Sequence, residues 1–140
     1  SWGGWVRPLN AVSKTLMHKG NEFRLTTDTS GVPACEIYSG GGWQTGAVGA
    51  DALSVGVWSH LLCTYDGENV QLYVDGALAD SQAESLEITS SSSTALSLGR
   101  DSAATGYFYG QLDDMRVYNY ALTATQVRTL HNLDSAVRFE

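Results

Sequence analysis

The segment "ENVQLYVDGALADS", residues 68–81, contains the pattern on which the fold prediction rests. Apolar side chains occupy every second position from residue 70 to residue 74. A period of two is typical of a β-strand with one buried face. Asp75 and Gly76 then tolerate the positive φ angles of a tight turn, and the chain returns through Leu78. The segment is therefore predicted to form a β-hairpin.

The rest of the chain extends this pattern. "WSHLLCTY", residues 58–65, is predicted to be another strand, joined to the hairpin by a turn at 66–69. Further strands are expected at residues 2–7, 14–18, 22–27, 33–38, 86–89, 95–99, 106–109 and 111–119. The glycine-rich run at 39–46 is interpreted as a turn. Because the polar stretch 89–94 is too short to divide the chain, a single domain over 1–140 is expected.

One helix is marked near the C-terminus, in "LTATQVRTLHN", residues 122–132. Thr123 and Gln126 have the spacing of a reciprocal capping box, and Leu122 can pack on Val127 as a hydrophobic staple. Many short strands, tight turns and one short helix indicate an all-β protein, a two-sheet antiparallel β-sandwich.

The amino-acid composition limits the classes of molecule that this chain is expected to bind. The chain has 140 residues, of which 16% are charged, with a net charge of −7 and a pI near 4.7. Nucleic acids and anionic membranes need clustered lysine and arginine, so neither is expected as a partner. No window is apolar over the length of a membrane span, and no signal peptide is found. The chain is expected to be either cytosolic or a mature or excised piece of an exported protein.

The two cysteines, Cys35 and Cys63, form no C-x-x-C pair, which disfavours zinc. Each alternates with an apolar neighbour, Ile37 or Leu61, so both are placed on apolar strand faces. They are either joined in a disulfide or are two reduced thiols in the core. A disulfide would close a loop of about 28 residues, contribute about 3–4 kcal/mol, and indicate an oxidising compartment.

Several motifs in this order resemble the laminin-G-like (concanavalin A-like) jelly-roll domains, over residues 2 to about 131. The most specific are the run from Trp58 through "LYVDG" and the segment "GQLDDMRVYNYAL" at 110–122; the others are "WVRP", "HKGNEFRL" and "LSLGR". The resemblance implies two packed antiparallel sheets, an extracellular or cell-surface location, and binding of carbohydrate or protein. Such domains are often appended to larger proteins, and some members of the family hold a calcium ion.

In one respect the chain departs from this family. Such domains usually begin with a further strand before the position of "SWGGWVRP", whereas here "LDSAVRFE", residues 133–140, resembles that strand. Either the tail folds back into the vacant position, as in a circular permutation, or it belongs to the next unit of a tandem array. An unfilled position would leave an open sheet edge, suited to strand addition from a neighbour.

Two adjacent acids, Asp113 and Asp114, raise the question of catalysis or metal binding. Strict alternation places Asp113 on the inner face with Met115 and Val117. A buried carboxylate must be paired or hydrogen-bonded, and we expect a structural role for it, satisfied by an arginine or by loop amides.

Calcium is the second interpretation of these acids, with Asp113 and Asp101 as ligands, because calcium binds several oxygen atoms and nearby loops supply further oxygen donors. Catalysis is the third. The catalytic relatives carry a Glu-x-Asp-x-x-Glu strand, and "AESLEI" at 83–88 lacks its aspartate. The three histidines lie far apart in sequence and have no evident nucleophile partner. No enzymatic activity is therefore predicted.

Binding residues are predicted in two loops and on one strand pair. The first loop, "YSGGGWQTG" at 38–46, contains Tyr38 and Trp43, and an exposed indole can stack on a sugar ring. The alternative is that Trp43 folds onto its own loop or onto a sheet face. The second loop, at 100–110, contributes Arg100, Asp101, Tyr107 and Tyr109.

His60 and Tyr73 are expected to share one sheet surface, which either lines a groove or is simply solvated. Four apolar residues are assigned to the core: Trp5, Trp58, Phe23 and Leu98.

Together these features predict a non-catalytic extracellular module that binds a glycan or polysaccharide. The alternative is a protein-adhesion domain or structural repeat that contacts neighbouring domains or a protein partner. A polysaccharide-degrading enzyme is the weaker alternative.

Overall fold

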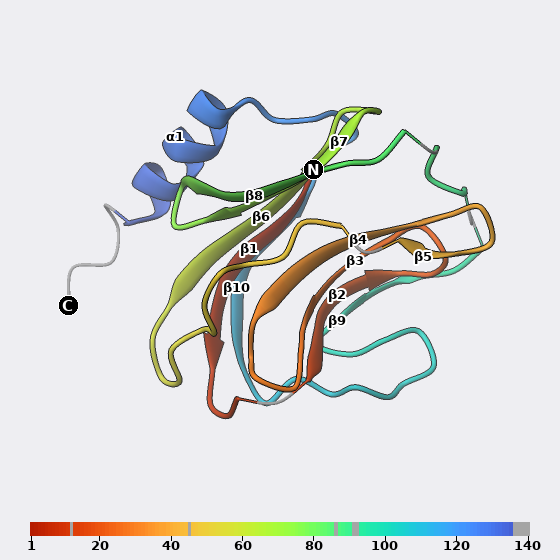
Figure 1. Ribbon diagram of the computed structural model, residues 1–140. Coiled ribbons are helices and arrows are strands. Elements are labelled where there is room, and N and C mark those ends of the chain that lie inside the picture. Colours follow the sequence, from red (N-terminus) through yellow and green to blue (C-terminus); the bar gives the residue numbers. More distant parts are fainter. Residues whose placement is uncertain (12, 45, 86, 91–92, 136–140) are drawn as a thin grey trace.

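The computed structural model describes residues 1–11, 13–44, 46–85, 87–90 and 93–135, which form two antiparallel five-stranded sheets packed face to face (Figure 1). Sheet A has the order β10-β1-β6-β7-β8, with β10 (Gly110–Val117), β1 (Trp2–Pro8), β6 (Ser59–Tyr65), β7 (Asn69–Val74) and β8 (Ala77–Ala83). Sheet B has the order β5-β4-β3-β2-β9, with β5 (Gly42–Gln44), β4 (Pro33–Ser39), β3 (Phe23–Thr27), β2 (Lys14–Lys19) and β9 (Leu96–Leu98). The predicted β-sandwich is confirmed.

Two predicted strands are wrong and one strand was missed. Residues 87–89 and 106–109 are not in strands; they are held by isolated backbone bonds such as Thr89 N to Tyr38 O, 2.9 Å, and Phe108 N to Gly99 O, 2.8 Å. Residues 39–46 were interpreted as a turn, and Gly40 and Gly41 do reverse the chain there, with φ angles of 58° and 86°. The residues after them pair with β4 as β5. A three-residue edge strand is too short for periodicity to detect.

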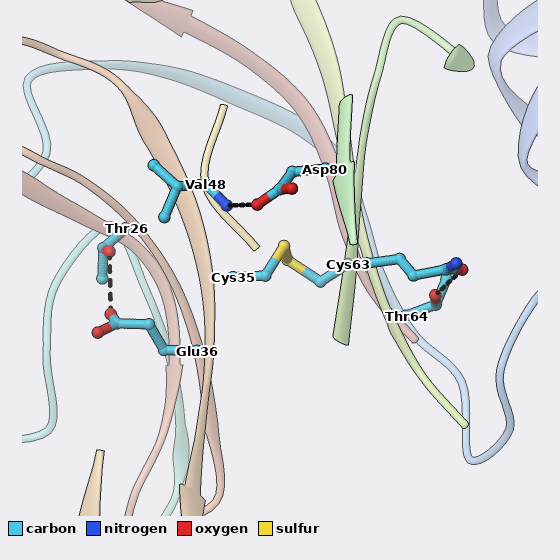
Figure 2. The surroundings of a disulfide bond; sticks show 8 residues. Thr26, Cys35, Glu36, Val48, Cys63, Thr64 and Asp80 are labelled. Carbon is cyan, nitrogen blue, oxygen red and sulfur yellow. Dashed lines mark hydrogen bonds between the residues drawn. A yellow bond between two sulfur atoms is a disulfide. The ribbon is translucent and has the colours of Figure 1, made fainter. Parts of the chain in front are cut away.

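The core lies between the sheets, where alternate residues of both layers meet. Its fully buried members include Val6 and Leu61 from sheet A and Met17, Leu25 and Ile37 from sheet B. A disulfide joins Cys35 of β4 to Cys63 of β6, with 5.7 Å between their Cα atoms (Figure 2). The predicted disulfide is confirmed, and it ties one sheet to the other through the middle of the core.

Helix α1 (Ala124–Ser135) packs on the outer face of sheet A. Its buried Val127 and the preceding Leu122 form a second apolar cluster with Leu62 and Tyr73. The capping box is confirmed, since the Thr123 amide donates to Gln126 Oε1 at 2.8 Å and the Gln126 amide donates to Thr123 Oγ1 at 3.3 Å. Sheet A is therefore covered on both faces.

The inward placement of Asp113 is wrong, because β10 contains a bulge. The pairing of β1 with β10 shifts between Gly3 and Trp5, and Asp114 has a φ angle of 52°. The extra residue returns Met115 to the core while Asp113, opposite Trp5, is exposed. Asp114 is also exposed and forms an ion pair with Arg116 at 2.7 Å.

No described helix is long and apolar enough to cross a membrane. The tail 133–140 was predicted as a possible additional strand. Its first part is wrong, since 133–135 belong to α1, and 136–140 lie outside the described residues.

Candidate functional site

The outer face of sheet B carries a row of polar and aromatic side chains across four strands. The strand register places His18 opposite Arg24, Arg24 opposite Glu36, and Tyr38 opposite Trp43. Residues that are directly opposite in an antiparallel pair point to the same face. We call these five residues the aromatic platform. Among the described elements the single helix lies on sheet A, so this face has no helix over it.

Trp43 is the centre of the platform. The guanidinium carbon of Arg24 lies 4.1 Å from the indole centroid, a distance at which a cation–π interaction is effective. The ring of Tyr38 meets the indole edge-on at 5.4 Å, and the imidazole of His18 lies 5.4 Å away. Trp43 is partly exposed and lies in β5, not in a loop as predicted. Its orientation is therefore fixed by neighbouring strands.

The charges on the platform are paired. Arg24 donates from Nε to Glu36 Oε2 at 2.6 Å and from Nη2 to Glu36 Oε1 at 2.9 Å. Thr26 Oγ1 donates to the same carboxylate at 3.2 Å, on the side of sheet B away from the disulfide (Figure 2). A two-pronged bond of this kind holds both side chains in one geometry. Tyr38 is fixed as well, since its hydroxyl donates to the Gly41 carbonyl at 2.8 Å.

His18 supplies an uncharged ring to the platform. Burial lowers its pKa from 6.5, and the nearby Arg24 lowers it further, so the ring is neutral at pH 7. Its Nδ1 atom is buried and has no hydrogen-bond partner among the described residues. A neutral imidazole can donate or accept through its second nitrogen, depending on the tautomer.

The loop at 99–109 borders the His18 end of the platform. Two backbone hydrogen bonds hold this loop beside β2: the Gly99 amide donates to the Leu16 carbonyl at 3.0 Å, and the Thr15 amide donates to the Gly106 carbonyl at 3.1 Å. Asp101 accepts bonds from the amide and hydroxyl of Thr105, and these bonds lower its pKa. Tyr107 and Tyr109 are 58% and 63% exposed. Arg100 is exposed on the same loop.

The placement of His60 and Tyr73 in a groove or on a solvated face is wrong. They do share a sheet face, as predicted, but that face is the one under α1, and they are only 3% and 4% exposed. His60 lies among aromatic rings, with Trp5 at 5.2 Å and His131 of α1 at 6.0 Å. Burial chiefly lowers the pKa of His60 to about 4.

The described residues include no group of three or more histidine, cysteine or acidic side chains that could hold a metal ion. The Asp101 carboxylate is used within its own loop, and Asp113 projects from the outer face of β10. These two aspartates therefore do not form the oxygen-rich set that calcium requires. Calcium binding stays a hypothesis, which titration with millimolar calcium would test.

The structure thus brings together two of the predicted binding residues, Tyr38 and Trp43, and adds three that the sequence analysis missed. Arg24, Glu36 and His18 come from separate strands and become neighbours through the sheet register. Their signal in the sequence was their alternation with the apolar residues Leu25, Ile37 and Met17, which marks them as outward-facing.

A family model described as the concanavalin A-like lectin/glucanases superfamily matches residues 1–128. Among solved structures, domain 4 of AbnA, a GH43 extracellular arabinanase from Geobacillus stearothermophilus in complex with arabinotriose, is 23% identical with a TM-score of 0.71. A Bacteroides ovatus protein, to which carbohydrate binding is assigned by inference, is 17% identical with a TM-score of 0.75. A SAP-like pentraxin from Limulus polyphemus is 14% identical with a TM-score of 0.64.

These likenesses cover most of this chain but only part of the other proteins. The alignments span 91%, 91% and 93% of this chain, and 63%, 39% and 68% of the arabinanase domain, the Bacteroides protein and the pentraxin. No protein with a curated description matches the sequence. At these identities the structural matches establish the fold.

Proposed function

Since the chain belongs to the concanavalin A-like lectin/glucanases superfamily, we propose that it is a non-catalytic carbohydrate-binding module whose ligand lies on the aromatic platform of sheet B. The observation that carries the proposal is the partly exposed indole of Trp43, held among Arg24, Tyr38 and His18 on a sheet face without a helix. Two of the similar structures, the arabinanase domain and the Bacteroides protein, are connected with carbohydrate and support this choice of ligand.

The chemistry of the platform suits a sugar. The apolar C–H face of a pyranose or furanose ring packs on an indole, while its hydroxyls need donors and acceptors at the ring edge. The guanidinium of Arg24 supplies donors, and the Glu36 carboxylate supplies acceptors. Because both side chains are already held by the ion pair, little side-chain entropy is lost when a ligand binds.

The number of carboxylates on the platform supports binding without hydrolysis. Glycoside cleavage uses two carboxylates, about 5 to 9.5 Å apart, on either side of the scissile bond. Among the five platform residues there is one carboxylate, Glu36, and it accepts bonds from Arg24 and Thr26. A carboxylate held in this way is suited to orienting hydroxyls.

We also propose an extracellular location and attachment to a larger protein. The disulfide between Cys35 and Cys63 supports an oxidising compartment. The arabinanase whose domain 4 shares the fold is itself extracellular.

Isothermal titration calorimetry tests the proposal. The ligands are arabinotriose and a panel of neutral oligosaccharides, and the proteins are the wild type and Trp43→Ala. We expect the substitution to weaken binding at least about tenfold, a loss of about 1.4 kcal/mol. Tyr120→Ala is the matched control, because Tyr120 is 53% exposed and lies outside the platform.

Two results would count against the proposal. Equal affinity of the wild type and Trp43→Ala would remove the platform as the site, and binding to none of the panel would weaken the assignment to carbohydrate. Circular dichroism of both variants checks that any loss does not come from unfolding.

A further inference from the structure

The flank of the sandwich between the edge strands β5 and β8 is covered by the chain that follows β5. Val48 forms an antiparallel bridge with Ala34 of β4, and its amide donates to Asp80 of β8 at 2.9 Å (Figure 2). Residues 46–49 therefore connect sheet B to sheet A on this flank. At the opposite edge of sheet B, Leu98 of β9 is 48% exposed, so the prediction that it lies in the core is wrong.

A cavity of about 270 Å³ lies next to this connection, between loop 49–54 and the turn that joins β7 to β8. The loop is held by two backbone bonds, because the Gly49 amide donates to the Pro33 carbonyl at 2.8 Å and the Leu53 amide donates to the Gly31 carbonyl at 3.0 Å. Cavities for drug-sized ligands measure about 300–1,000 Å³. This cavity is therefore of a size for a single side chain.

The cavity wall combines apolar surface with carboxylates. Leu53, Val74 and Pro33 supply the apolar surface, while Asp51 and Asp75 supply the carboxylates. Among the described residues that line the cavity there is no lysine or arginine, and several are glycine or alanine, which leave room. The wall therefore suits a ligand that has an aliphatic part and a positive charge.

Ser59 adds a hydroxyl to this wall. It alternates along β6 with the core residues Leu61 and Cys63, so its side chain points between the sheets, where it lines the cavity. Ser59 is 9% exposed, and its hydroxyl has no hydrogen-bond partner among the described residues. Because buried polar groups are nearly always hydrogen-bonded, this hydroxyl is suited to a ligand that enters the cavity.

Asp75 is already held in position. Its Oδ1 accepts a bond from the His60 amide at 2.7 Å, and its own amide donates to the His60 carbonyl at 2.8 Å. The second carboxylate oxygen, Oδ2, can accept a further bond. A fixed acceptor loses little conformational entropy when a ligand binds.

We propose that this cavity binds the side chain of a lysine presented by a partner protein. An ammonium group has three N–H donors, and the carboxylates of Asp51 and Asp75 and the hydroxyl of Ser59 provide acceptors on three residues. The aliphatic stem of lysine packs on Leu53 and Val74 while its charge lies at the acidic groups. The net charge of −7 favours a basic partner as well.

Lysine fits this wall better than other cations. The planar fork of arginine suits one carboxylate that binds it with both oxygens, whereas here the acceptors come from three separate residues. An amino sugar carries its ammonium directly on a hydroxylated ring, so it has no aliphatic stem to pack on Leu53 and Val74. The inference is independent of the proposed sugar site, since the aromatic platform lies on the outer face of sheet B.

A nuclear magnetic resonance titration of the full chain with an acetylated, amidated peptide of sequence GGKGG tests the proposal. We expect saturable shifts in the amides of residues 49–54 and 74–76, which weaken as salt is added. The same peptide with an acetylated lysine Nζ lacks the charge and should leave these amides in place. Glucosamine should also leave them in place at equal concentration.

Two variants and one matched control assign the binding to named groups. Asp51→Asn should weaken the affinity at least about fivefold, and Ser59→Ala, which keeps the net charge, at least about twofold. Glu68→Gln removes the same charge as Asp51→Asn at an exposed position beside the other end of β7, and it should bind as the wild type. The melting temperature of each variant shows that the fold is kept.

Three results would overturn the proposal. Equal shifts with the acetylated peptide would show that the charge is not recognised. Tighter binding of glucosamine than of the lysine peptide would assign the cavity to a sugar. Equal losses in Asp51→Asn and Glu68→Gln would trace the attraction to the overall charge of the chain.

Discussion

Both outer faces of this sandwich belong to five-stranded antiparallel sheets, but the face of sheet A packs against α1 and the face of sheet B does not. On sheet A, Leu62 and Tyr73 face outward and are buried under α1, with Val127 packed on them. On sheet B, the equivalent outward positions hold Arg24, Glu36 and other platform residues. Apolar outward residues require a cover, whereas paired charges around an indole tolerate solvent. This comparison supports the proposed ligand site on the outer face of sheet B.

The largest expected effect comes from a charge placed under the helix. Val127→Asp should reduce the free energy of unfolding by about 4 kcal/mol, because Val127 is fully buried and no counter-charge is available in the apolar cluster. Chemical denaturation measures the loss.

Two comparisons sharpen this result. Thr125→Asp, at an exposed position on the same helix, should change the free energy of unfolding by less than about 0.5 kcal/mol. Tyr38→Asp, on the outer face of sheet B, should cost about 2 kcal/mol, since it removes one hydrogen bond and the edge-on contact with Trp43 at a partly exposed site. Equal losses at Val127 and Tyr38 would break the distinction between the two faces.

Lowering the pH is expected to reduce the free energy of unfolding by a smaller amount. The pKa of His60 is about 4 in the fold against 6.5 in the unfolded chain. Between these values the unfolded chain binds a proton that the folded protein does not, so stability is retained above pH 6.5 and falls as the pH drops toward 4. The loss at the lower limit is about 3 kcal/mol.

Melting temperatures recorded from pH 7 to pH 4 check this dependence. His60→Phe should flatten the profile, because the substitution removes the proton site and keeps an aromatic ring against Trp5. His18→Phe, on sheet B, should flatten it less, since the pKa of His18 is lowered in the same direction but the ring lies under no helix. An unchanged slope in His60→Phe would contradict the assignment.

Among the platform residues, a smaller effect on stability is expected at Arg24. Both Arg24 and Glu36 are partly exposed, so Arg24→Lys should cost less than about 1 kcal/mol in unfolding free energy. Lysine cannot form the two-pronged bond or stack as a plane on the indole, so the affinity for an oligosaccharide should fall more clearly than the stability. Denaturation and calorimetry on the same variant separate the two quantities.

Many of the strands could be predicted because short stretches of sequence contain the pattern that specifies them. Val70, Leu72 and Val74 occupy every second position, the turn residues Asp75 and Gly76 follow, and the structure has β7 and β8 there; β6 covers most of the strand predicted at 58–65. Thr123 and Gln126 likewise mark the start of α1 by spacing alone. Position 113 could not be predicted, because a bulge adds one residue to the count and is set by the partner strand.

The candidate site was predictable in part, for a related reason. Trp43 and Tyr38 are close in sequence, whereas His18, Arg24 and Glu36 reach the indole only through cross-strand register. His60 and Tyr73 were assigned to the correct sheet face. That α1 covers this face depends on tertiary packing, which the alternation of a single strand does not encode.

The proton–nitrogen spectrum of the four tryptophan indoles, recorded during a titration with arabinotriose or another bound oligosaccharide, tests the central claim most directly. Trp43 lies on the platform, while Trp5 is buried under α1 and Trp2 lies in the core. The platform account predicts that the Trp43 indole resonance shifts progressively while those of Trp2 and Trp5 stay in place. A saturable titration in which Trp43 does not move would contradict it.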